Sequence, residues 1–437
     1  MKNSIIVSLL LVRELVRAIL APVHLLLYLP QRRKWRAAAR RVLEQAPIQV
    51  GESLPGEFGS GVSGGGRVFI SAGETSGESH AVKVVQAVRA AGGNARFIGF
   101  GGHLLEAEGV DIQYPLSDRA VMGVSGVLRN LPFILGAIRR FLTMLDKDAP
   151  DLVVLVDYPG LHLVLARLAK KRGIPVLHYI APQYWAWGPW RMYRYKRSVS
   201  ATLTILPFET SFFEADGIPS QYVGHPLLDL PAPVPVELPA EPFLCLLPGS
   251  RRREILLNLP GMIRAAKALC EQHGEFEVIL PHVDPRHARL IREVLAAHGG
   301  EFVQFRQGPI GPFLAAAQLV LAKSGTGSLE ACLYGTPTVV VYQLPGVLAA
   351  FFARNCLSVP FIASANLIAG QEVVPEFCFR NPDGWQKVED SVAKLWTDDE
   401  VRSRCRTDLA QVRARLGDPG ASARVARWIL PFCREAS

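Results

Sequence analysis

Several signatures of common protein classes are missing from this 437-residue sequence. Its seven cysteines form no CxxC pair and are odd in number, which argues against a disulfide framework and fits a reducing compartment. No Walker lysine motif occurs, and the GxGxxG pattern at residues 59–64 lies in a Gly/Ser-rich stretch before the first apolar run, without the preceding strand that a dinucleotide site needs, so ATP hydrolysis and NAD binding are disfavoured. A small-x-small cleavage site is also lacking before the basic N-terminal segment, which argues against a cleaved export signal.

The length and the charge distribution bound the architecture. A chain of this length exceeds one ordinary core, so two domains are expected, and 49% apolar residues are enough to fill both. The formal net charge is +9, and the first 50 residues carry most of it, with nine Lys/Arg against two Glu. A nucleic-acid-binding body would spread its cations over a working face. The asymmetry therefore indicates a basic N-terminal attachment and no nucleic-acid partner.

Residues 1–45 are predicted to associate with a membrane surface. Residues 5–30 are apolar, but Arg13, Glu14 and Arg17 interrupt them, and such charges are costly in the middle of a span. The polar residues fall on one side of a helical wheel, as in an interfacial helix, and the following QRRKWRAAARR suits anionic headgroups. A signal-anchor span, an uncleaved export signal and a helix docked on the protein's own body are the alternatives.

From residue 67 onward the sequence alternates apolar, β-branched runs with amphipathic stretches, which is typical of parallel sheets covered by helices. We expect an α/β protein with two doubly wound, Rossmann-like domains facing a cleft. The predicted parts are a Gly/Ser/Pro-rich flexible linker (46–66), an acceptor-side domain (67–230), a proline-rich connector (231–242) and a second domain with a helical tail (243–437). Ligands of such sheets bind beyond the carboxyl ends of the strands.

Two strand-to-helix turns of the second half predict a nucleotide-diphosphate site. In LLPGSRRRE, Gly249 permits close approach, Ser250 can donate, and Arg251 adds charge at a helix N-terminus. A charged helix start with Glu254 as a capping partner is the alternative. The other turn, KSGTGSLE, combines glycines with hydroxyls and places a carboxylate one helical turn later, where it can bind ribose hydroxyls. Its candidate residues are Ser324, Gly325, Thr326 and Glu330, with helix capping as a compatible role.

The first half offers candidates for acid–base chemistry. Asp157 ends a buried run, where partial desolvation can raise the pKa of a carboxylate towards that of a general base. Capping of the helix near Gly160 is the alternative role. The loop SAGETSGES follows another strand with glycines, hydroxyls and carboxylates, and Glu74 and Ser76 are its candidates for bonding sugar hydroxyls. His225, at the domain junction, is a binding candidate, although a lone histidine is more often structural.

A further helical pattern extends over residues 126–145. Its apolar residues recur at helical spacing with arginines on the flanks. A core helix is the default interpretation, and the same pattern suits acyl chains or a membrane surface.

Ten short motifs follow one another along residues 67 to about 380. They are GETSGE, AVMG, DYPG, APQYWAW, LPFE, VGHPL, LLPGSR, SGTGSLE, GTP and NLIAG followed by EVVPE. In this order they resemble the lipid-A-disaccharide synthases. That resemblance implies a GT-B glycosyltransferase, inverting and independent of metals and cofactors. It would move 2,3-diacylglucosamine from UDP onto 2,3-diacylglucosamine 1-phosphate and release UDP, as a step in lipopolysaccharide and outer-membrane biogenesis.

The resemblance also assigns roles and a location. Asp157 would accept the proton of the acceptor 6′-hydroxyl, and Glu74, Ser76 and Asn366 map onto motif positions that line the cleft. Residues 249–251 and 324–330 would bind the UDP moiety. The enzyme would work at the cytoplasmic face of the inner membrane, peripherally or with an N-terminal anchor, and the resemblance allows a homodimer.

Some positions depart from the family's pattern, several of them near the expected acceptor side. They are Gly126 in place of a glutamate, His162 in place of an asparagine, Lys323 in place of a small residue, Gln371 and Phe379. These departures therefore bear on the identity of the acceptor more than on UDP-sugar binding. Two other hypotheses remain: a UDP-GlcNAc 2-epimerase of the same architecture, against which residues 1–45 count, and a non-catalytic UDP-sugar-binding relative.

Overall fold

A computed structural model of the chain describes residues 13, 16, 20, 23, 24, 27–45, 58, 66–119, 130–230 and 235–433. These residues form two compact units. The first comprises residues 1–35, 48–229 and 418–437, and the second comprises residues 36–47 and 230–417. Each unit has its own parallel sheet with helices, so the prediction of two Rossmann-like α/β domains is confirmed.

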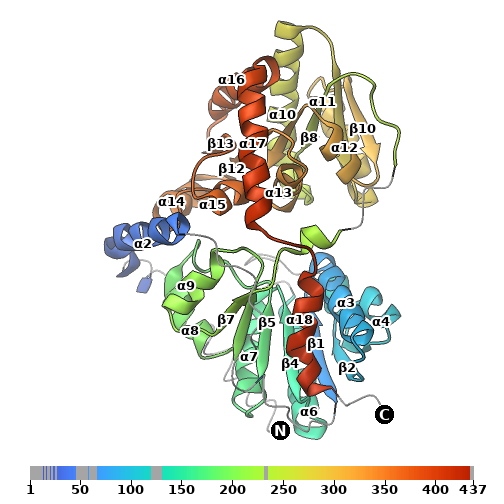
Figure 1. The fold of residues 1–437 in the computed structure, drawn as a ribbon, viewed down its shortest axis with the longest axis vertical. Helices are drawn as coiled ribbons and strands as arrows, with labels where there is room; N and C mark the ends of the chain where they lie inside the picture. Colours follow the sequence, from blue (N-terminus) through green and yellow to red (C-terminus); the bar gives the residue numbers. More distant parts are fainter. Residues whose placement is uncertain are drawn as a thin grey trace. The chain divides into compact units, whose positions relative to one another are not determined.

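The first unit is built on a seven-stranded sheet in the order β3-β2-β1-β4-β5-β6-β7 (Figure 1). Its strands are β1 (Arg67–Ala72), β2 (Arg96–Phe100), β3 (Asp111–Tyr114), β4 (Leu152–Val156), β5 (Val176–Tyr179), β6 (Ala201–Thr204) and β7 (Ser220–Tyr222). All of the pairings are parallel, and the central strand β4 is buried along its whole length, because helices cover both faces. The apolar runs at 68–72, 95–100, 151–157, 175–181 and 201–206 predict the other five strands, and only β3 and β7, the two short edge strands, were missed.

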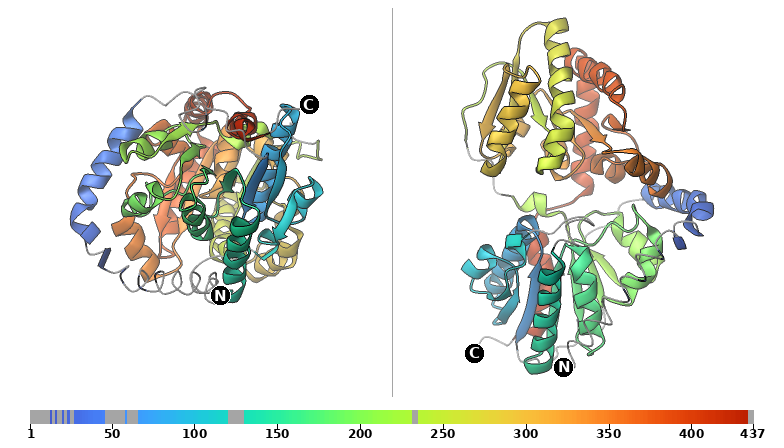
Figure 2. Two further views of the ribbon diagram at one scale, coloured as in Figure 1. Left: turned by 90° about the horizontal axis from the view of Figure 1, so that it is seen from below. Right: turned by 180° about the vertical axis from the view of Figure 1, so that it is seen from behind.

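Helices pack on this sheet in pairs. They are α3 (Thr75–Ala90), α4 (His103–Ala107), α6 (Leu131–Lys147), α7 (Pro159–Lys170), α8 (Met192–Lys196), α9 (Glu209–Ala215) and α18 (Ala421–Ile429). Helices α3 and α18 pack together on one face, and α6 and α7 on the other (Figure 2). The apolar stripe of α6 is mostly core, since Ile138, Phe141, Leu142 and Leu145 are buried. The default interpretation of residues 131–145 is therefore supported, while residues 120–129 lie outside the described part.

The C-terminal helix α18 belongs to the first unit, whereas the sequence analysis had placed residues 243–437 together. The main physical reason is burial, because Val425, Trp428 and Ile429 of α18 belong to the hydrophobic core of the first unit. Asp229 adds a cap, since its carboxylate accepts hydrogen bonds from the amides of Gly420 (2.6 Å) and Ser422 (3.1 Å). Within the expected linker, Phe58 is buried against the rings of Trp428 and Phe432. That position of the linker is thus packed against the first unit.

The second unit has a six-stranded sheet in the order β10-β9-β8-β11-β12-β13. Its strands are β8 (Phe243–Leu247), β9 (Glu277–His282), β10 (Val303–Gln307), β11 (Leu319–Lys323), β12 (Thr338–Gln343) and β13 (Glu376–Phe379). Its helices are α10 (Arg252–His273), α11 (Ala288–Ala297), α12 (Gly311–Ala316), α13 (Thr326–Leu333), α14 (Val347–Cys356), α15 (Ser364–Ala369), α16 (Gly384–Thr397) and α17 (Asp399–Arg415). The apolar runs at 243–248, 276–281, 302–305, 319–322 and 338–342 predict the other five strands, and the edge strand β13 was missed.

The N-terminal segment contributes a short 3-10 helix, η1 (Leu29–Gln31), and helix α2 (Arg32–Glu44). Other 3-10 helices are η3 (Ser117–Arg119), η4 (Pro189–Arg191), η5 (Pro226–Asp229), η6 (Pro285–His287) and η7 (Leu430–Phe432). Within the parts that the structure describes, no helix combines the length and the hydropathy needed to cross a bilayer. Most of residues 5–30, on which the interfacial-helix prediction depends, lie outside those parts.

Candidate functional site

In the first unit, the predicted residues of two loops meet at the carboxyl edge of the sheet. Strands β1 and β4 are hydrogen-bonded neighbours, with Ala72 opposite Val156, so the loops that follow them lie side by side. A Cβ atom on Gly73 would lie 2.1 Å from Cγ of Tyr158. Only glycine therefore fits beneath the tyrosine ring. A Cβ on Gly77 would lie 3.7 Å from Cβ of Asp157, which places the first turn of α3 against the candidate base.

Asp157 lies in an unusual backbone turn. Both Asp157 (φ 55°) and Tyr158 (φ 49°) adopt the left-handed conformation, which costs an L-residue about 1–2 kcal/mol. Two imidazoles bond the carbonyl oxygen of Asp157: Nδ1 of His162 at 2.7 Å and Nε2 of His178 at 3.1 Å. A carbonyl oxygen only accepts, so both nitrogens donate. The two histidines thus hold in place the peptide group that carries the candidate base.

Both histidines are neutral. Burial, assisted by His178, lowers the pKa of His162 to about 3, and burial lowers the pKa of His178 to about 4. With the proton of His162 on Nδ1, its Nε2 accepts a hydrogen bond from the hydroxyl of Ser71 (2.8 Å). Because these pKa values lie well below neutrality, the pattern of donors and acceptors around Asp157 does not change near pH 7. Sequence reasoning noted His162 only as a departure and missed His178.

In the loop SAGETSGES, some polar residues remain accessible to a ligand and others stabilise the fold. Glu74 is the half-buried N-cap residue of α3, and Ser76 is exposed in the first turn of that helix. Glu78, by contrast, is buried and accepts hydrogen bonds from the amides of Gly102 (2.8 Å) and Leu105 (3.0 Å). Its carboxylate therefore fixes a neighbouring loop. Of the two glutamates, only Glu74 remains a candidate for contact with a sugar.

His225 is buried beside η5. Its Nδ1 accepts a hydrogen bond from the amide of Leu227 (3.2 Å), so the proton of the neutral ring is on Nε2. Burial, reinforced by the neighbouring His80, lowers the pKa of His225 to about 3. The residue can donate one hydrogen bond to a ligand, but it cannot act as a cation near neutral pH.

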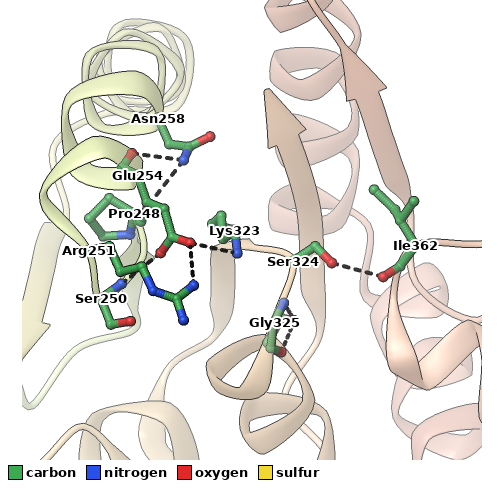
Figure 3. Close-up of polar contacts among 10 residues, drawn as sticks. Pro248, Ser250, Arg251, Glu254, Asn258, Lys323, Ser324, Gly325 and Ile362 are labelled. Atoms are coloured by element: carbon green, nitrogen blue, oxygen red, sulfur yellow. Dashed lines mark hydrogen bonds and ion pairs between the residues drawn. The ribbon is translucent and has the colours of Figure 1, made fainter. Parts of the chain in front are cut away.

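In the second unit, strands β8 and β11 are neighbours, so the two predicted phosphate and ribose loops also share one edge of a sheet. Gly249 has φ +115°, and a Cβ atom there would lie 2.5 Å from Oε2 of Glu254. The amide of Ser250 donates to the same oxygen (3.1 Å), as Figure 3 shows. Glycine is therefore required both for the backbone conformation and for the approach of an anionic oxygen.

The Glu254 carboxylate is surrounded by donors and cations. Its Oε1 lies 3.1 Å from Nζ of Lys323 and 3.3 Å from Nη1 of Arg251 (Figure 3). Burial opposes ionisation of Glu254, but Lys323 and Arg251 outweigh it and lower the pKa of this carboxyl. An amide and two cations thus converge on one anion, the arrangement that a diphosphate also needs. The sequence analysis did not predict Lys323 as a site residue, although its position directly before the SGTGSLE turn indicates one.

The turn between β11 and α13 contains both a structural residue and candidates for nucleotide binding. The hydroxyl of Ser324 donates to the carbonyl of Ile362 (2.8 Å), which supports a structural part for this residue. Gly325 and Thr326 are exposed at the start of α13. Glu330 is half-buried one turn later, and burial raises its pKa. The exposed residues and the Glu330 carboxylate remain candidates for contact with a nucleotide.

Asn366 is a buried residue that stabilises the loops of the second unit through hydrogen bonds. The side chain is fully buried, and its amide nitrogen donates to the carbonyl of Val374 (2.9 Å) and to Glu376 (2.9 Å). Its oxygen accepts from the amides of Val373 (2.8 Å) and Val374 (3.0 Å). These four bonds fill its capacity, so the substrate contact expected for Asn366 is replaced by a structural role.

Glu376 is the residue that Asn366 positions. It accepts hydrogen bonds from the amides of Ile362 (2.9 Å) and Ala363 (2.8 Å), and Ile362 in turn receives the hydroxyl of Ser324. Burial raises the pKa of Glu376. This chain of bonds fixes the start of α13. Glu376 is the last residue of the EVVPE motif, and the sequence analysis did not predict a role for it.

The comparisons with known proteins agree on one family. The model of the lipid-A-disaccharide synthetase family matches residues 68–421. A lipid-A-disaccharide synthase from Acidobacterium capsulatum is 37% identical over 374 residues, covering 82% of this chain and 93% of that protein. One from Myxococcus xanthus is 34% identical over 375 residues, covering 83% and 97%.

Solved structures share the fold at low sequence identity. The S. aureus MnaA structure with UDP matches with a TM-score of 0.56 and 14% identity, covering 82% of this chain and 94% of that one. The UDP-GlcNAc 2-epimerase from Neisseria meningitidis bound to UDP-GlcNAc matches with a TM-score of 0.52 and 14% identity, covering 80% and 97%. At such identities these similarities support only the GT-B-like architecture.

Proposed function

The chain belongs to the lipid-A-disaccharide synthase family, and we propose that Asp157 is the general base of its glycosyl transfer. The protein is a glycosyltransferase of lipid A disaccharide synthesis. The donor is UDP-2,3-diacylglucosamine and the acceptor is 2,3-diacylglucosamine 1-phosphate. Family membership favours this function over the epimerase alternative.

The acceptor 6′-hydroxyl oxygen attacks the anomeric carbon of the donor from the face opposite UDP. A bond forms between that oxygen and the anomeric carbon, the bond to the β-phosphate oxygen breaks, and the hydroxyl proton passes to the Asp157 carboxylate. Inversion follows from the direction of attack. The products are the disaccharide 1-phosphate and UDP. Glu74 and Ser76, beside Asp157 at the same sheet edge, bond hydroxyls of the acceptor sugar.

UDP leaves as an anion, so its diphosphate needs positive charge and amide donors. The loop of Gly249, Ser250 and Arg251 supplies them, and Lys323 adds a second cation. In the structure Glu254 neutralises these cations, and the arriving diphosphate displaces its carboxylate from Arg251 and Lys323. Glu330 accepts the ribose hydroxyls, while Gly325 and Thr326 offer donors at the start of α13. His225 donates from Nε2 to the bound substrate.

His162 and His178 are positioning residues. They do not touch the reacting atoms, but their N–H groups bond the Asp157 carbonyl and stabilise the left-handed turn. A displacement of about 1 Å in a catalytic group can cost two orders of magnitude in rate. The observation that carries this proposal is the orientation of Asp157 at the carboxyl end of β4 by two neutral imidazoles.

A lipid substrate calls for access to a membrane. Val16, Leu20, Val23 and Leu27 lie three or four residues apart in helical conformation, and all four are exposed. This spacing supports peripheral attachment of residues 1–45 to an anionic bilayer, for which the family's reaction suggests the cytoplasmic face of the inner membrane. We propose this membrane location together with the identity of the acceptor. A homodimer is compatible with both.

The deciding experiment supplies UDP-2,3-diacylglucosamine with and without 2,3-diacylglucosamine 1-phosphate and measures both UDP and disaccharide. We expect equal amounts of the two products, formed only when the acceptor is present. Release of UDP without acceptor would point to a different reaction. Binding of the donor without any turnover would support a non-catalytic relative.

A further inference from the structure

Helix α14 of the second unit presents an apolar face to solvent. Val347, Leu348, Phe351 and Phe352 are 70%, 69%, 43% and 40% exposed. Positions i, i+1, i+4 and i+5 of a helix lie on one side, so the four side chains form one continuous surface. A contiguous exposed apolar surface of this kind marks an interaction site more often than chance exposure does.

Helix α2 is fixed at the end of α14. The guanidinium of Arg36 donates from Nε to the carbonyl of Leu357 (3.0 Å) and from Nη2 to the carbonyl of Arg354 (2.6 Å). These acceptors terminate α14, where a cation also complements the helix dipole. Near the other end of α2, a Cβ atom on Gly370 would lie 2.6 Å from the carbonyl oxygen of Leu43. The two helices lie side by side in Figures 1 and 2.

The two helices differ in what they expose. On α2, Ala39 and Leu43 are buried against the protein, while Arg40 and Arg41 are exposed. Arg354 of α14 is also exposed. The sequence contains no acidic residue between Glu330 and Glu372, a stretch that includes all of α14, and Glu44 is the only acidic residue of α2. Helix α14 therefore supplies exposed apolar side chains, and α2, which Arg36 holds at the C-terminal end of α14, supplies exposed positive charge.

We propose that α14 and α2 together form a surface that binds an anionic lipid bilayer, with α14 inserting between headgroups and α2 contacting their charges. Hereafter we call this surface the α2–α14 face. Apolar side chains beside cations that lack acidic neighbours are complementary to an anionic interface. The inference rests on the membrane attachment proposed above and extends it to the second unit. Helix α2 precedes the family match at residue 68, so the face is partly an addition of this chain.

The test measures co-sedimentation of the full chain with phosphatidylcholine vesicles, with and without phosphatidylglycerol. Leu348→Ser combined with Phe351→Ser removes exposed apolar area and should weaken binding by at least about tenfold. The matched control is Leu256→Ser with Val283→Ser, which changes two exposed apolar residues elsewhere in the second unit and should leave binding unchanged. Equal binding by both double variants would overturn the proposal.

Charge is tested separately. Arg40→Gln with Arg41→Gln should weaken binding to anionic vesicles roughly 25-fold, since each cation near such a surface contributes about fivefold. Added salt should remove most of this difference and little of the difference due to α14. Arg289→Gln with Arg306→Gln is the control for net charge. If the control pair weakens binding as much, a diffuse charge effect replaces the specific surface, and the proposal is wrong.

Turnover of short-acyl, water-soluble substrates without vesicles distinguishes this inference from the proposed function. The α14 variant should keep wild-type turnover in that assay, because the bilayer takes no part in it. A variant that loses this turnover but still binds vesicles would show that the α2–α14 face holds substrate acyl chains, which would overturn the bilayer proposal. Loss of soluble turnover in the wild-type chain would instead refute the proposed function.

Discussion

Replacing His162 perturbs the support of Asp157 without altering its carboxylate. The His162 ring is fully buried, donates to the Asp157 carbonyl at 2.7 Å and accepts from Ser71 at 2.8 Å. His162→Ala removes both bonds and leaves a buried hydroxyl without its partner, which costs about 1–3 kcal/mol of unfolding free energy. A looser turn should also lower kcat about 100-fold, since misplacement by about 1 Å costs that much.

His162→Asn separates positioning from packing. An amide offers one N–H donor for the carbonyl and one oxygen for the hydroxyl of Ser71, and lipid-A-disaccharide synthases usually carry asparagine at this point of the motif. We expect its kcat to stay within about tenfold of the wild type. Steady-state kinetics with both substrates varied should show the loss for alanine in kcat rather than in the KM for the donor.

The matched control is Ser200→Ala. Ser200 is buried at the opposite, amino end of the same sheet, where its hydroxyl accepts from the amide of Val176 (3.1 Å). This variant should lose similar stability in urea unfolding but keep kcat. If His162→Ala is destabilised and retains wild-type kcat, or if alanine and asparagine behave alike, His162 is structural only and the positioning role is refuted.

Three further predictions concern Lys323, Gly73 and the pair of buried histidines. Lys323→Met should weaken UDP binding about tenfold in calorimetry, because a charge-assisted bond is lost; an unchanged Kd would remove Lys323 from the diphosphate site. Gly73→Ala should displace the ring of Tyr158 and destabilise the protein by about 1–3 kcal/mol, and wild-type stability would contradict the close approach. Burial lowers the pKa values of His162 and His178 to about 3 and about 4, from 6.5 in the unfolded chain. Their contribution to the free energy of unfolding is therefore fully present above pH 6.5. It falls as the pH drops below 6.5, because only the unfolded chain takes up protons there. Between pH 8 and pH 5 each should cost about 2 kcal/mol, and urea unfolding of His162→Asn should show a fall smaller by that amount.

Much of the fold could be predicted from the sequence. The apolar runs of both halves identified every central strand, because strands buried on both faces need nearly uninterrupted apolar side chains. The edge strands β3, β7 and β13 were missed, since a short, half-exposed strand has no such run. The return of α18 to the first unit was also missed. It depends on the burial of α18 in the core of the first unit and on Asp229, which caps a helix almost 200 residues later, and local patterns encode neither contact.

The candidate site was predictable at the level of loops and less so at the level of side chains. Glycines marked the turns correctly, because the close approaches of Gly73 and Gly249 leave no room for a Cβ. The roles of Asn366 and Glu78 could not be read in the same way. Both polar side chains are consumed by internal hydrogen bonds that only the folded chain brings together.

The central claim is that Asp157 accepts a proton during glycosyl transfer, and the turnover of Asp157→Asn tests it most directly. The substitution keeps the shape of the side chain and removes its basic oxygen, so kcat at saturating donor and acceptor should fall by about 10²–10⁴-fold. UDP binding should be unchanged, because the diphosphate loops lie in the other unit. A kcat close to that of the wild type would contradict the account.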